Sequence, residues 1–453
     1  MLRTNPLFTI FVLMALLISA CQPVVAPTES TPHYAHPEAL ASTEWLADHL
    51  TDPSLRILDG RAPPDEGAPT SQAAYEAGHI PGAVHVDVIA DISDPNGAVP
   101  MLILPKADFE ALMGRLGIGN DTTVVIYDDM GNTWMARVWW ALRYYGHDNV
   151  KLLDGGLTKW TLEGRPLETG TNTPSPATFT AHVRPELLAT RADVEQAIAD
   201  PAIVLIDALP AAYYIGVQTY PSFRTGHIPT ALNLPGPDNL DPVDNTVLPP
   251  AELAQLWQPL ALQPDQRIIT YCGGGYVGAF DLFLLYQLGY EQISLYDASL
   301  IEWATAPELP MEMTLTPAEV ANAAVVADAA QALMAAGVDA SLAYFADDAT
   351  YQVVMMGETT TYTGQAELRA WMEELVAQHF RIEVQVVQAA GDMVTTKTFT
   401  WNDGTVQLGI APLVATEAYT IRDGKIQSAV WTLSPASEAK LQAALAAATA
   451  STE

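Results

Sequence analysis

The sequence predicts two consecutive α/β domains built on parallel sheets, followed by a smaller α+β domain. Three observations support this prediction. In residues 41–309, short β-branched segments alternate with helical ones, which is the pattern of a parallel sheet covered on both faces. Landmarks in the first half of that region recur in its second half at nearly constant spacing. Beyond residue 316 the pattern changes to helices followed by alternating strands.

Length, charge and cysteine content narrow the class of protein. At about 150 residues per domain, 453 residues are enough for three domains. The 53 acidic residues against 20 Lys and Arg give a net charge of −33, which argues against nucleic acid or an anionic membrane surface as a partner. The only cysteines, Cys21 and Cys272, lie in such different contexts that we expect no disulfide. We expect neither a metal nor an organic cofactor.

The N-terminus is typical of a secretory signal. Residues 1–21 combine an early Arg3, an apolar run and a small-residue end, and are too short for a comfortable membrane span. Their end, Ile-Ser-Ala-Cys, resembles a bacterial lipobox, which implies that Cys21 becomes the lipidated first residue. An ordinary signal peptide or anchor that happens to contain a cysteine is the alternative. With residues 22–40 as a flexible tether, we expect an extracytoplasmic lipoprotein of the cell envelope that contacts the membrane through its lipid only.

The first domain is expected over residues 41–168 and begins with a helix capped by Ser42 or Thr43. Its other predicted elements alternate between strand and helix. They are a strand at 56–59, a helix at 109–116, a strand at 124–127, a helix at 136–145 and a strand at 150–153.

The second domain, residues 188–309, repeats the first after a linker at residues 169–178. Four landmarks recur in the same order with spacings of 143 to 148 residues: Asp59 and Asp207, the Gly-His-Ile-Pro motifs that begin at Gly78 and Gly226, Tyr127 and Tyr271, and Trp160 and Trp303. Such a repeat indicates a duplicated domain.

One stretch of the second copy carries clear chemistry. A buried strand is predicted up to Tyr271, Cys272 follows it, Gly273–Gly275 form a tight loop, and a helix then points its N-terminus back at the sulfur. The helix N-terminus and converging backbone N–H groups of a glycine-rich loop stabilise a thiolate or persulfide without a basic side chain. The alternative is a structural cysteine that acts as a small hydrophobe.

This stretch resembles the active-site loop of the rhodanese-type sulfurtransferases, and residues 41–309 resemble their tandem form, the thiosulfate and 3-mercaptopyruvate sulfurtransferases. The resemblance implies an enzyme in which Cys272 takes a sulfane sulfur from a small-molecule donor, holds it as a persulfide and passes it to cyanide or a thiol. It also implies substrate binding by the loop residues Gly273, Gly274, Gly275, Tyr276, Val277 and Gly278. A carrier or ligand-binding sensor that is loaded without turnover is the alternative.

The duplication assigns different functions to the two copies. Asp128 occupies the position of the cysteine in the first copy, and a carboxylate cannot form a persulfide. We therefore expect the first domain to be catalytically silent. The resemblance implies that it helps to form the cleft.

The resemblance also points to substrate-binding residues outside the loop. Thiosulfate-type members follow the cysteine with Arg and Lys, whereas this chain has glycines, so 3-mercaptopyruvate is favoured as donor. The family's carboxylate-binding arginine aligns with Tyr213, which leaves Arg224 to bind the carboxylate unless it is only a solvated loop charge. In mercaptopyruvate-type relatives a histidine of the first domain has a supporting catalytic role, which the resemblance assigns to His79 here. The alternative is a structural residue of a turn, which is more common for a histidine two residues before a proline.

The third domain is expected over residues 317–433. Its predicted elements are helices at 317–336 and 365–379 and strands at 381–389, 393–400, 415–421 and 426–433. The domain resembles the NTF2-like, SnoaL-like superfamily, whose cone-shaped sheets often hold a pocket. Tyr351, Trp371, Trp401 and Trp431 either line such a pocket or fill the core. The sequence shows no catalytic pair of residues here, so a small ligand or a dimer contact is expected as much as catalysis. An Ala-rich helical tail follows at 434–453.

Overall fold

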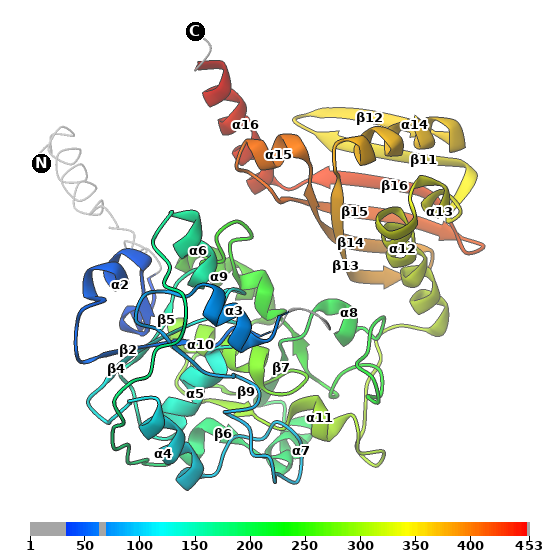
Figure 1. Cartoon of the computed structure of the whole chain (residues 1–453). Helices are drawn as coiled ribbons and strands as arrows, with labels where there is room; N and C mark the ends of the chain where they lie inside the picture. Colours follow the sequence, from blue (N-terminus) through cyan, green and yellow to red (C-terminus); the bar gives the residue numbers. More distant parts are fainter. Residues whose placement is uncertain (1–32, 63–68, 451–453) are drawn as a thin grey trace, which may run out of the picture. The chain divides into compact units, whose positions relative to one another are not determined.

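The computed structural model describes residues 33–62 and 69–450, without the side chains of 448–450. Figure 1 shows the chain coloured along its sequence. The signal segment, Cys21 and residues 22–32 of the expected tether lie outside the described residues, so their assignments remain predictions. The end of the expected tether is not a flexible link, because Pro37–Ala39 form a short 3-10 helix and Leu40 begins the first strand, paired with Leu152. No helix in the described ranges combines the length and apolar character needed to cross a membrane.

The first copy is a five-stranded sheet with strand order β1-β5-β4-β2-β3, and all of its pairings are parallel. The strands are β1 Leu40–Ala41, β2 Leu55–Asp59, β3 Val84–His85, β4 Thr123–Tyr127 and β5 Val150–Leu153. The helices are η1 Pro37–Ala39, α2 Thr43–His49, α3 Ser71–Ala77, α4 Lys106–Arg115, α5 Ala136–Tyr144 and α6 Gly156–Leu162. The predicted alternation of strands and helices is confirmed.

The second copy repeats this topology in a parallel sheet with the order β6-β10-β9-β7-β8. Its strands are β6 Leu188–Ala189, β7 Ile203–Asp207, β8 Leu232–Asn233, β9 Arg267–Tyr271 and β10 Ile293–Tyr296. Its helices are η2 Pro185–Leu187, α7 Arg191–Ala199, α8 Ala211–Tyr214, η3 Gly236–Asn239, α9 Pro250–Trp257, η4 Gln258–Leu260, α10 Tyr276–Gln287 and α11 Ser299–Trp303. Cys272 therefore directly follows β9, the central strand.

The two copies share a hydrophobic core, and each also has a separate one of its own. A single cluster of buried side chains contains residues of α5 from the first copy and of α10 from the second. At their contact, the rings of Trp139 and Phe283 meet edge to face with centroids 5.0 Å apart. Burial on nearly all sides explains why α10 is apolar around its circumference rather than along one stripe. The shared core brings the first copy next to the loop that begins at Cys272.

The third domain is built on a six-stranded sheet with the order β12-β11-β16-β15-β14-β13, against which α12 lies (Figure 1). Its strands are β11 Phe345–Met355, β12 Glu358–Thr363, β13 Arg381–Ala390, β14 Met393–Trp401, β15 Leu413–Arg422 and β16 Lys425–Leu433. Its helices are α12 Pro317–Ala336, α13 Val338–Leu342, α14 Gly364–Ala377 and α15 Asp403–Gln407, and α16 Pro435–Ala450 forms the tail.

The antiparallel meander β13-β14-β15-β16 matches the four strands expected from the sequence. Two further strands were not predicted. β11 pairs in parallel with β16, and it begins with exposed aspartates that obscure its alternation; β12 is an almost fully exposed edge strand rich in threonine. Neither strand shows the apolar-polar alternation that identifies a half-buried strand.

Candidate active site

Cys272 lies at the carboxyl end of β9 and is only 2% exposed. Its backbone is fixed by the segment that follows β10. The Cys272 N–H donates to Ser299 Oγ at 3.2 Å, and its carbonyl accepts from the Leu300 N–H at 3.0 Å. Ser299 Oγ in turn donates to the Tyr296 carbonyl at 2.8 Å. The cysteine is thus held by two neighbouring strand ends at the edge of the sheet where parallel α/β proteins bind ligands.

Backbone N–H groups converge on the sulfur as the sequence predicts, but burial has the larger effect. Burial raises the pKa of the Cys272 thiol, while hydrogen bonds from the N–H groups of Gly278, Gly274 and Gly275 act to lower it. The net shift is upward. The loop therefore offers partners for an anionic sulfur, although the resting thiol is protonated at neutral pH.

Two glycines are required by the space around the loop. Gly275 caps α10 with φ of +83°, and a Cβ there would contact Arg137 and lie 2.7 Å from the Asp297 carbonyl oxygen. At Gly278 a Cβ would lie 2.9 Å from the Tyr271 carbonyl carbon, because α10 packs directly against β9. These close approaches allow the helix N-terminus to come near the sulfur.

Arg137, on α5 of the first copy, reaches into the loop of the second copy. Its Nη1 donates to the Gly274 carbonyl at 3.1 Å and lies 2.7 Å from Asp297 Oδ1, while Nη2 donates to the Met101 carbonyl. Its guanidinium also lies over the Tyr276 ring, 4.7 Å from the centroid. We had not predicted this residue. The signal was a lone cation within the apolar run 135–142, but its target lies 137 residues further along the chain.

Aromatic side chains surround the loop where a cation was expected. A Cβ on Gly273 would lie 3.1 Å from the Tyr220 ring, and Tyr220 stacks on Tyr213 with centroids 4.7 Å apart. The Phe223 ring meets Tyr220 edge to face at 5.4 Å. Burial and the charge on Cys272 both raise the pKa of Tyr220. The structure thus connects the predicted residue Tyr213 to the loop through Tyr220, which we had not predicted.

Val277 lies on the first turn of α10 and packs against Gly236, where a Cβ would come 2.5 Å from Val277 Cγ1. Its side chain is therefore occupied with joining α10 to η3.

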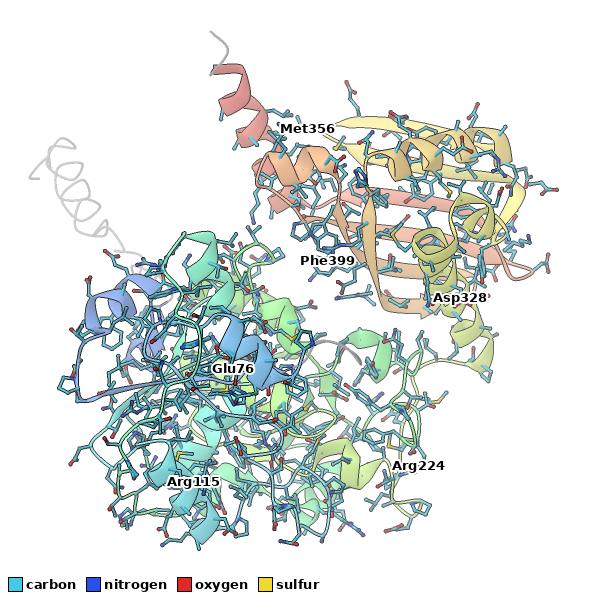
Figure 2. All side chains as sticks on the ribbon, viewed as in Figure 1. Glu76, Arg115, Arg224, Asp328, Met356 and Phe399 are labelled. Atoms are coloured by element: carbon cyan, nitrogen blue, oxygen red, sulfur yellow. The ribbon has the colours of Figure 1, made fainter. Side chains whose placement is uncertain are left out.

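Arg224 lies on the loop between α8 and β8 (Figure 2). Its Nε donates to the Ala304 carbonyl at 3.1 Å and its Nη1 to the Leu309 carbonyl at 2.7 Å. Its Nη2 donates to the carbonyls of Trp303 and Ala306, at 2.9 and 2.6 Å. Four of its five N–H groups are used to hold the end of α11, which leaves no two-pronged donor for a substrate carboxylate.

His79 makes its contacts within the first copy and the linker. Its Nδ1 donates to the Tyr75 carbonyl at 2.8 Å, its ring stacks on Tyr75, and its Nε2 lies 3.2 Å from Asn172 Nδ2. In the second copy, His227 likewise forms a hydrogen bond with the Tyr214 carbonyl and stacks on the Tyr214 ring. The repeated motif therefore has the same structural function in both copies, and these contacts do not bring His79 to the Cys272 loop.

Asp128, the counterpart of Cys272, gathers the N–H groups of its own loop. Oδ1 accepts from Met130 and Asn132 at 2.8 and 2.6 Å, and Oδ2 accepts from Trp134 and Met135 at 3.1 and 3.2 Å. Burial raises the pKa of this carboxyl to about 6 against the effect of these bonds. In the first copy, the loop thus holds a carboxyl group at the position where the second copy holds sulfur.

Comparison with known proteins gives the family of each part. A model of the rhodanese-like domain matches residues 42–163 and 190–306, and a model of the SnoaL-like domain matches residues 326–429. The sulfur carrier protein TtuD of Thermus thermophilus is 38% identical over 290 residues, which cover 61% of this chain and 98% of that protein. The 3-mercaptopyruvate sulfurtransferase of Escherichia coli is 34% identical over 273 residues, with coverages of 59% and 96%.

Among solved structures, the fold resembles SseA from Escherichia coli, described as a 3-mercaptopyruvate sulfotransferase with the rhodanese fold. The two share 32% identity with a TM-score of 0.53, covering 58% of this chain and 98% of SseA. The duplicated parallel sheets, the cysteine loop and these matches agree. The chain belongs to the rhodanese family of sulfurtransferases, as a tandem member with a SnoaL-like domain after its two rhodanese-like domains.

Proposed function

We propose that this enzyme moves a sulfane sulfur from a small-molecule donor, through a persulfide on Cys272, to cyanide or a thiol. The observation that carries the proposal is the position of Cys272 at the end of the central strand, where the N–H groups of Gly274, Gly275 and Gly278 converge on its sulfur.

The chemistry needs no oxidant or cofactor. The Cys272 thiolate attacks the sulfane sulfur of the donor and forms an S–S bond. With thiosulfate, the donor's S–S bond breaks and sulfite leaves with its electron pair. With 3-mercaptopyruvate, the C–S bond breaks, and the carbon takes the electron pair and the proton to give pyruvate. The acceptor then attacks the outer sulfur and releases the Cys272 thiolate, leaving thiocyanate or an acceptor persulfide as product.

The raised pKa of the Cys272 thiol has a consequence for the first step. The reactive thiolate is a minor species at neutral pH. We therefore expect the thiolate to form mainly when the donor is bound and the polar groups of the donor join the hydrogen bonds around the sulfur. In the persulfide, the same N–H groups hold the anionic sulfur. The four N–H groups that meet Asp128 in the silent copy support this anion-holding function for the loop.

For the donor, we favour 3-mercaptopyruvate over thiosulfate, because Gly273 and Gly274 place no cation after Cys272. Since Arg224 is bonded to four carbonyls, donor recognition falls to the loop N–H groups and to the hydroxyls of Tyr213 and Tyr220. Within the described residues no hydrogen bond fixes either hydroxyl. A carboxylate can accept from both.

A sulfur carrier is the second candidate, favoured by the 38% identity to the carrier protein TtuD and by the burial of Cys272. Steady-state assays with thiosulfate and 3-mercaptopyruvate as donors and cyanide as acceptor distinguish the two. Repeated turnover that is abolished by Cys272→Ser supports the transferase, whereas loading of one sulfur per chain without turnover supports the carrier. Turnover in Cys272→Ser close to that of the wild type would refute both.

The envelope location remains part of the proposal and rests on the sequence of residues 1–21. Lipid attachment needs the sulfur of Cys21, so Cys21→Ala is expected to release the protein from membranes or leave it unprocessed. Detergent partitioning and N-terminal processing that are both the same for Cys21→Ala and the wild type would exclude the lipid anchor.

A further inference from the structure

The cavity expected in the SnoaL-like domain is present, with a volume of about 220 Å³. Its lining includes Tyr351, Trp371 and Trp431. Trp401 is not part of this lining, because successive residues of a strand point to opposite sides and Trp401 lies on the outer face of β14. A different cavity, which we had not predicted, lies where the two rhodanese-like domains meet.

This second cavity has a volume of about 290 Å³ and is lined by side chains of both copies. Trp139, Trp140 and Arg143 come from α5 of the first copy, and Tyr286, Tyr290 and Glu291 come from the end of α10 and the turn after it in the second. Cys272 precedes the other end of α10. At 1.5 Å per residue, the ten residues from Tyr276 to Tyr286 span about 15 Å of helix axis. The cavity is therefore separate from the sulfur-transfer site.

Arg143 is the arginine of this cavity, and stacking between rings fixes its orientation. Its guanidinium carbon lies 4.8 Å from the centroid of the Trp139 ring and 3.9 Å from that of Tyr286. The His36 ring stacks on Tyr286 with centroids 3.7 Å apart. Since two groups cannot lie this close to the same face of one ring, Arg143 and His36 cover opposite faces of Tyr286. Stacking of this kind places the guanidinium without using its N–H groups.

Most N–H groups of Arg143 have no strong protein acceptor. Its Nε donates to Asp148 Oδ1 at 3.3 Å, and Asp148 already accepts two bonds of 2.6 Å from Arg184. Among the described residues, no carboxylate or carbonyl accepts from Nη1 or Nη2. The Tyr286 hydroxyl is close enough that Arg143 acts to lower its pKa against the effect of burial. With 16% of its side chain exposed, Arg143 presents an accessible fork that suits the two oxygens of a carboxylate.

The cavity also has a carboxylate, that of Glu291. Glu291 is exposed, and it forms no ion pair with any Lys, Arg or His of the described chain, Arg143 included. The two opposite charges thus line one cavity without pairing, so a molecule between them can meet both. The rings of Trp140 and Tyr290 add aromatic surface, and Trp140 is fixed by its Nε1, which donates to the Leu187 carbonyl at 2.9 Å.

We propose that this cavity binds a small aromatic amino acid as its zwitterion, with the carboxylate on Arg143, the ammonium on Glu291 and the ring against the aromatic lining. Such a ligand neutralises both charges of the cavity and leaves no charged group of its own unpaired. The volume agrees with this class of ligand. Since a cavity of about 150 Å³ accepts benzene, one of about 290 Å³ suits roughly twelve non-hydrogen atoms, which is the size of phenylalanine.

Isothermal titration calorimetry of the full chain at neutral pH tests this proposal, with L-phenylalanine as the probe. Two compounds of similar size each lack one charge: 3-phenylpropionate has no ammonium, and phenethylamine has no carboxylate. Phenylalanine is expected to bind saturably, with one molecule per chain, severalfold more tightly than 3-phenylpropionate and at least tenfold more tightly than phenethylamine.

Two variants assign the two charges. Arg143→Gln is expected to weaken phenylalanine at least tenfold and to leave phenethylamine within about threefold. Glu291→Gln is expected to weaken phenylalanine severalfold and to leave 3-phenylpropionate within about threefold. Because Glu291 is exposed, its variant serves if Arg143→Gln does not fold.

Arg115→Gln is the matched control. It neutralises an exposed arginine in the last turn of α4, outside the cavity (Figure 2), and unchanged binding is expected. The proposal is overturned if phenylalanine does not bind saturably, if it binds no better than phenethylamine, or if Arg143→Gln and Arg115→Gln bind it equally. Wild-type affinity for phenylalanine in Glu291→Gln would likewise overturn the zwitterion.

Discussion

Arg137 of the first copy forms an ion pair with Asp297 of the second copy, with Nη1 and Oδ1 2.7 Å apart and both side chains buried. The same guanidinium donates to the Gly274 carbonyl in the loop that follows Cys272. The copy with Asp128 in place of the cysteine thus supplies a cation that the loop of the other copy lacks.

Each copy has an aspartate, directly after its last strand, that accepts a backbone N–H of the other copy. Asp297 follows β10 and accepts the Ile103 N–H of the first copy at 2.8 Å, whereas Asp154 follows β5 and accepts the Val247 N–H of the second copy at 2.9 Å. Only Asp297 is also paired with an arginine of the other copy, because α10, the counterpart of α5, contains no Lys or Arg. The duplication preserved the backbone exchange and made the charges asymmetric.

The first prediction concerns Arg137. Removing one partner of a buried ion pair typically costs about 3–5 kcal/mol, so Arg137→Met should lower the free energy of unfolding by that amount and reduce kcat. The double variant Arg137→Met/Asp297→Asn should recover much of the stability, because it leaves no unpaired buried charge, but not the turnover. Urea unfolding and steady-state kinetics measure the two quantities. Wild-type kcat in the double variant would mean that Arg137 only balances Asp297.

The second prediction concerns the silent loop. Asp128→Ala leaves four backbone N–H groups without their acceptor, which should cost roughly 2 kcal/mol or more of unfolding free energy. The kcat/KM of the folded variant should stay within about threefold of wild type, because the chemistry belongs to the other copy. A larger loss of kcat/KM at temperatures where the variant is fully folded would give the first copy a direct part in catalysis.

The sequence predicted what is local and missed what joins distant segments. The strand, loop and helix around Cys272 lie within 21 consecutive residues, so periodicity and glycine positions were enough to place them. Arg137 and Asp297 meet only because the two copies share a core, and neither sequence segment contains a pattern that predicts contact with the other. The same reason hid the buried carboxyl of Glu417, since the Tyr351 hydroxyl that donates to it comes from another strand, and β11 itself was not predicted.

Two single side chains were assigned from residue type or from position in the sequence, and the structure places them differently. From its residue type we expected Trp401 either to line the pocket or to fill the core, yet its place on β14 puts it on the outer face. Arg224 was chosen as the nearest cation in sequence, but the carbonyls that it bonds belong to the end of α11 and the following turn. Residue type suggests a function, whereas the tertiary partner decides it.

The third prediction concerns the pH dependence of stability. Burial raises the pKa of Asp207 and Glu417 to about 7, and that of Asp128 and Asp154 to about 6. These carboxyls bind a proton more tightly in the folded than in the unfolded chain, where the pKa is about 4. Their stabilising effect is therefore complete below about pH 4 and is lost as the pH rises towards 7, by about 1.4 kcal/mol per unit of pKa difference.

Urea unfolding at pH 5, 6, 7 and 8 should accordingly give a free energy of unfolding that falls with rising pH. Asp207→Asn should flatten the decline, because the amide does not titrate. Carboxylates with a lowered pKa, such as Asp193 at about 2, act in the opposite direction only at lower pH. Burial lowers the pKa of His85, His147 and His227, which opposes the decline only up to about pH 6.5, so the decline should be steepest above that pH. A free energy that stays level or rises from pH 5 to pH 8 would contradict the prediction.

The last prediction concerns the charge of the donor. The wild-type enzyme should have a higher kcat/KM for 3-mercaptopyruvate than for thiosulfate, because the loop offers a dianion only N–H groups and no side-chain cation. Gly273→Arg adds a cation beside Cys272, and its Cβ, 3.1 Å from the Tyr220 ring, requires only a small shift of that ring. A charge-assisted hydrogen bond contributes about 1.5–3 kcal/mol, so kcat/KM for thiosulfate should rise roughly tenfold or more relative to 3-mercaptopyruvate.

The control variant is Gly273→Gln, whose side chain is similar in length but neutral. It should leave the ratio of the two kcat/KM values near that of the wild type, which separates the effect of charge from the displacement of Tyr220. An equal change of the ratio in both variants would show that access past Tyr220, and not charge, selects the donor.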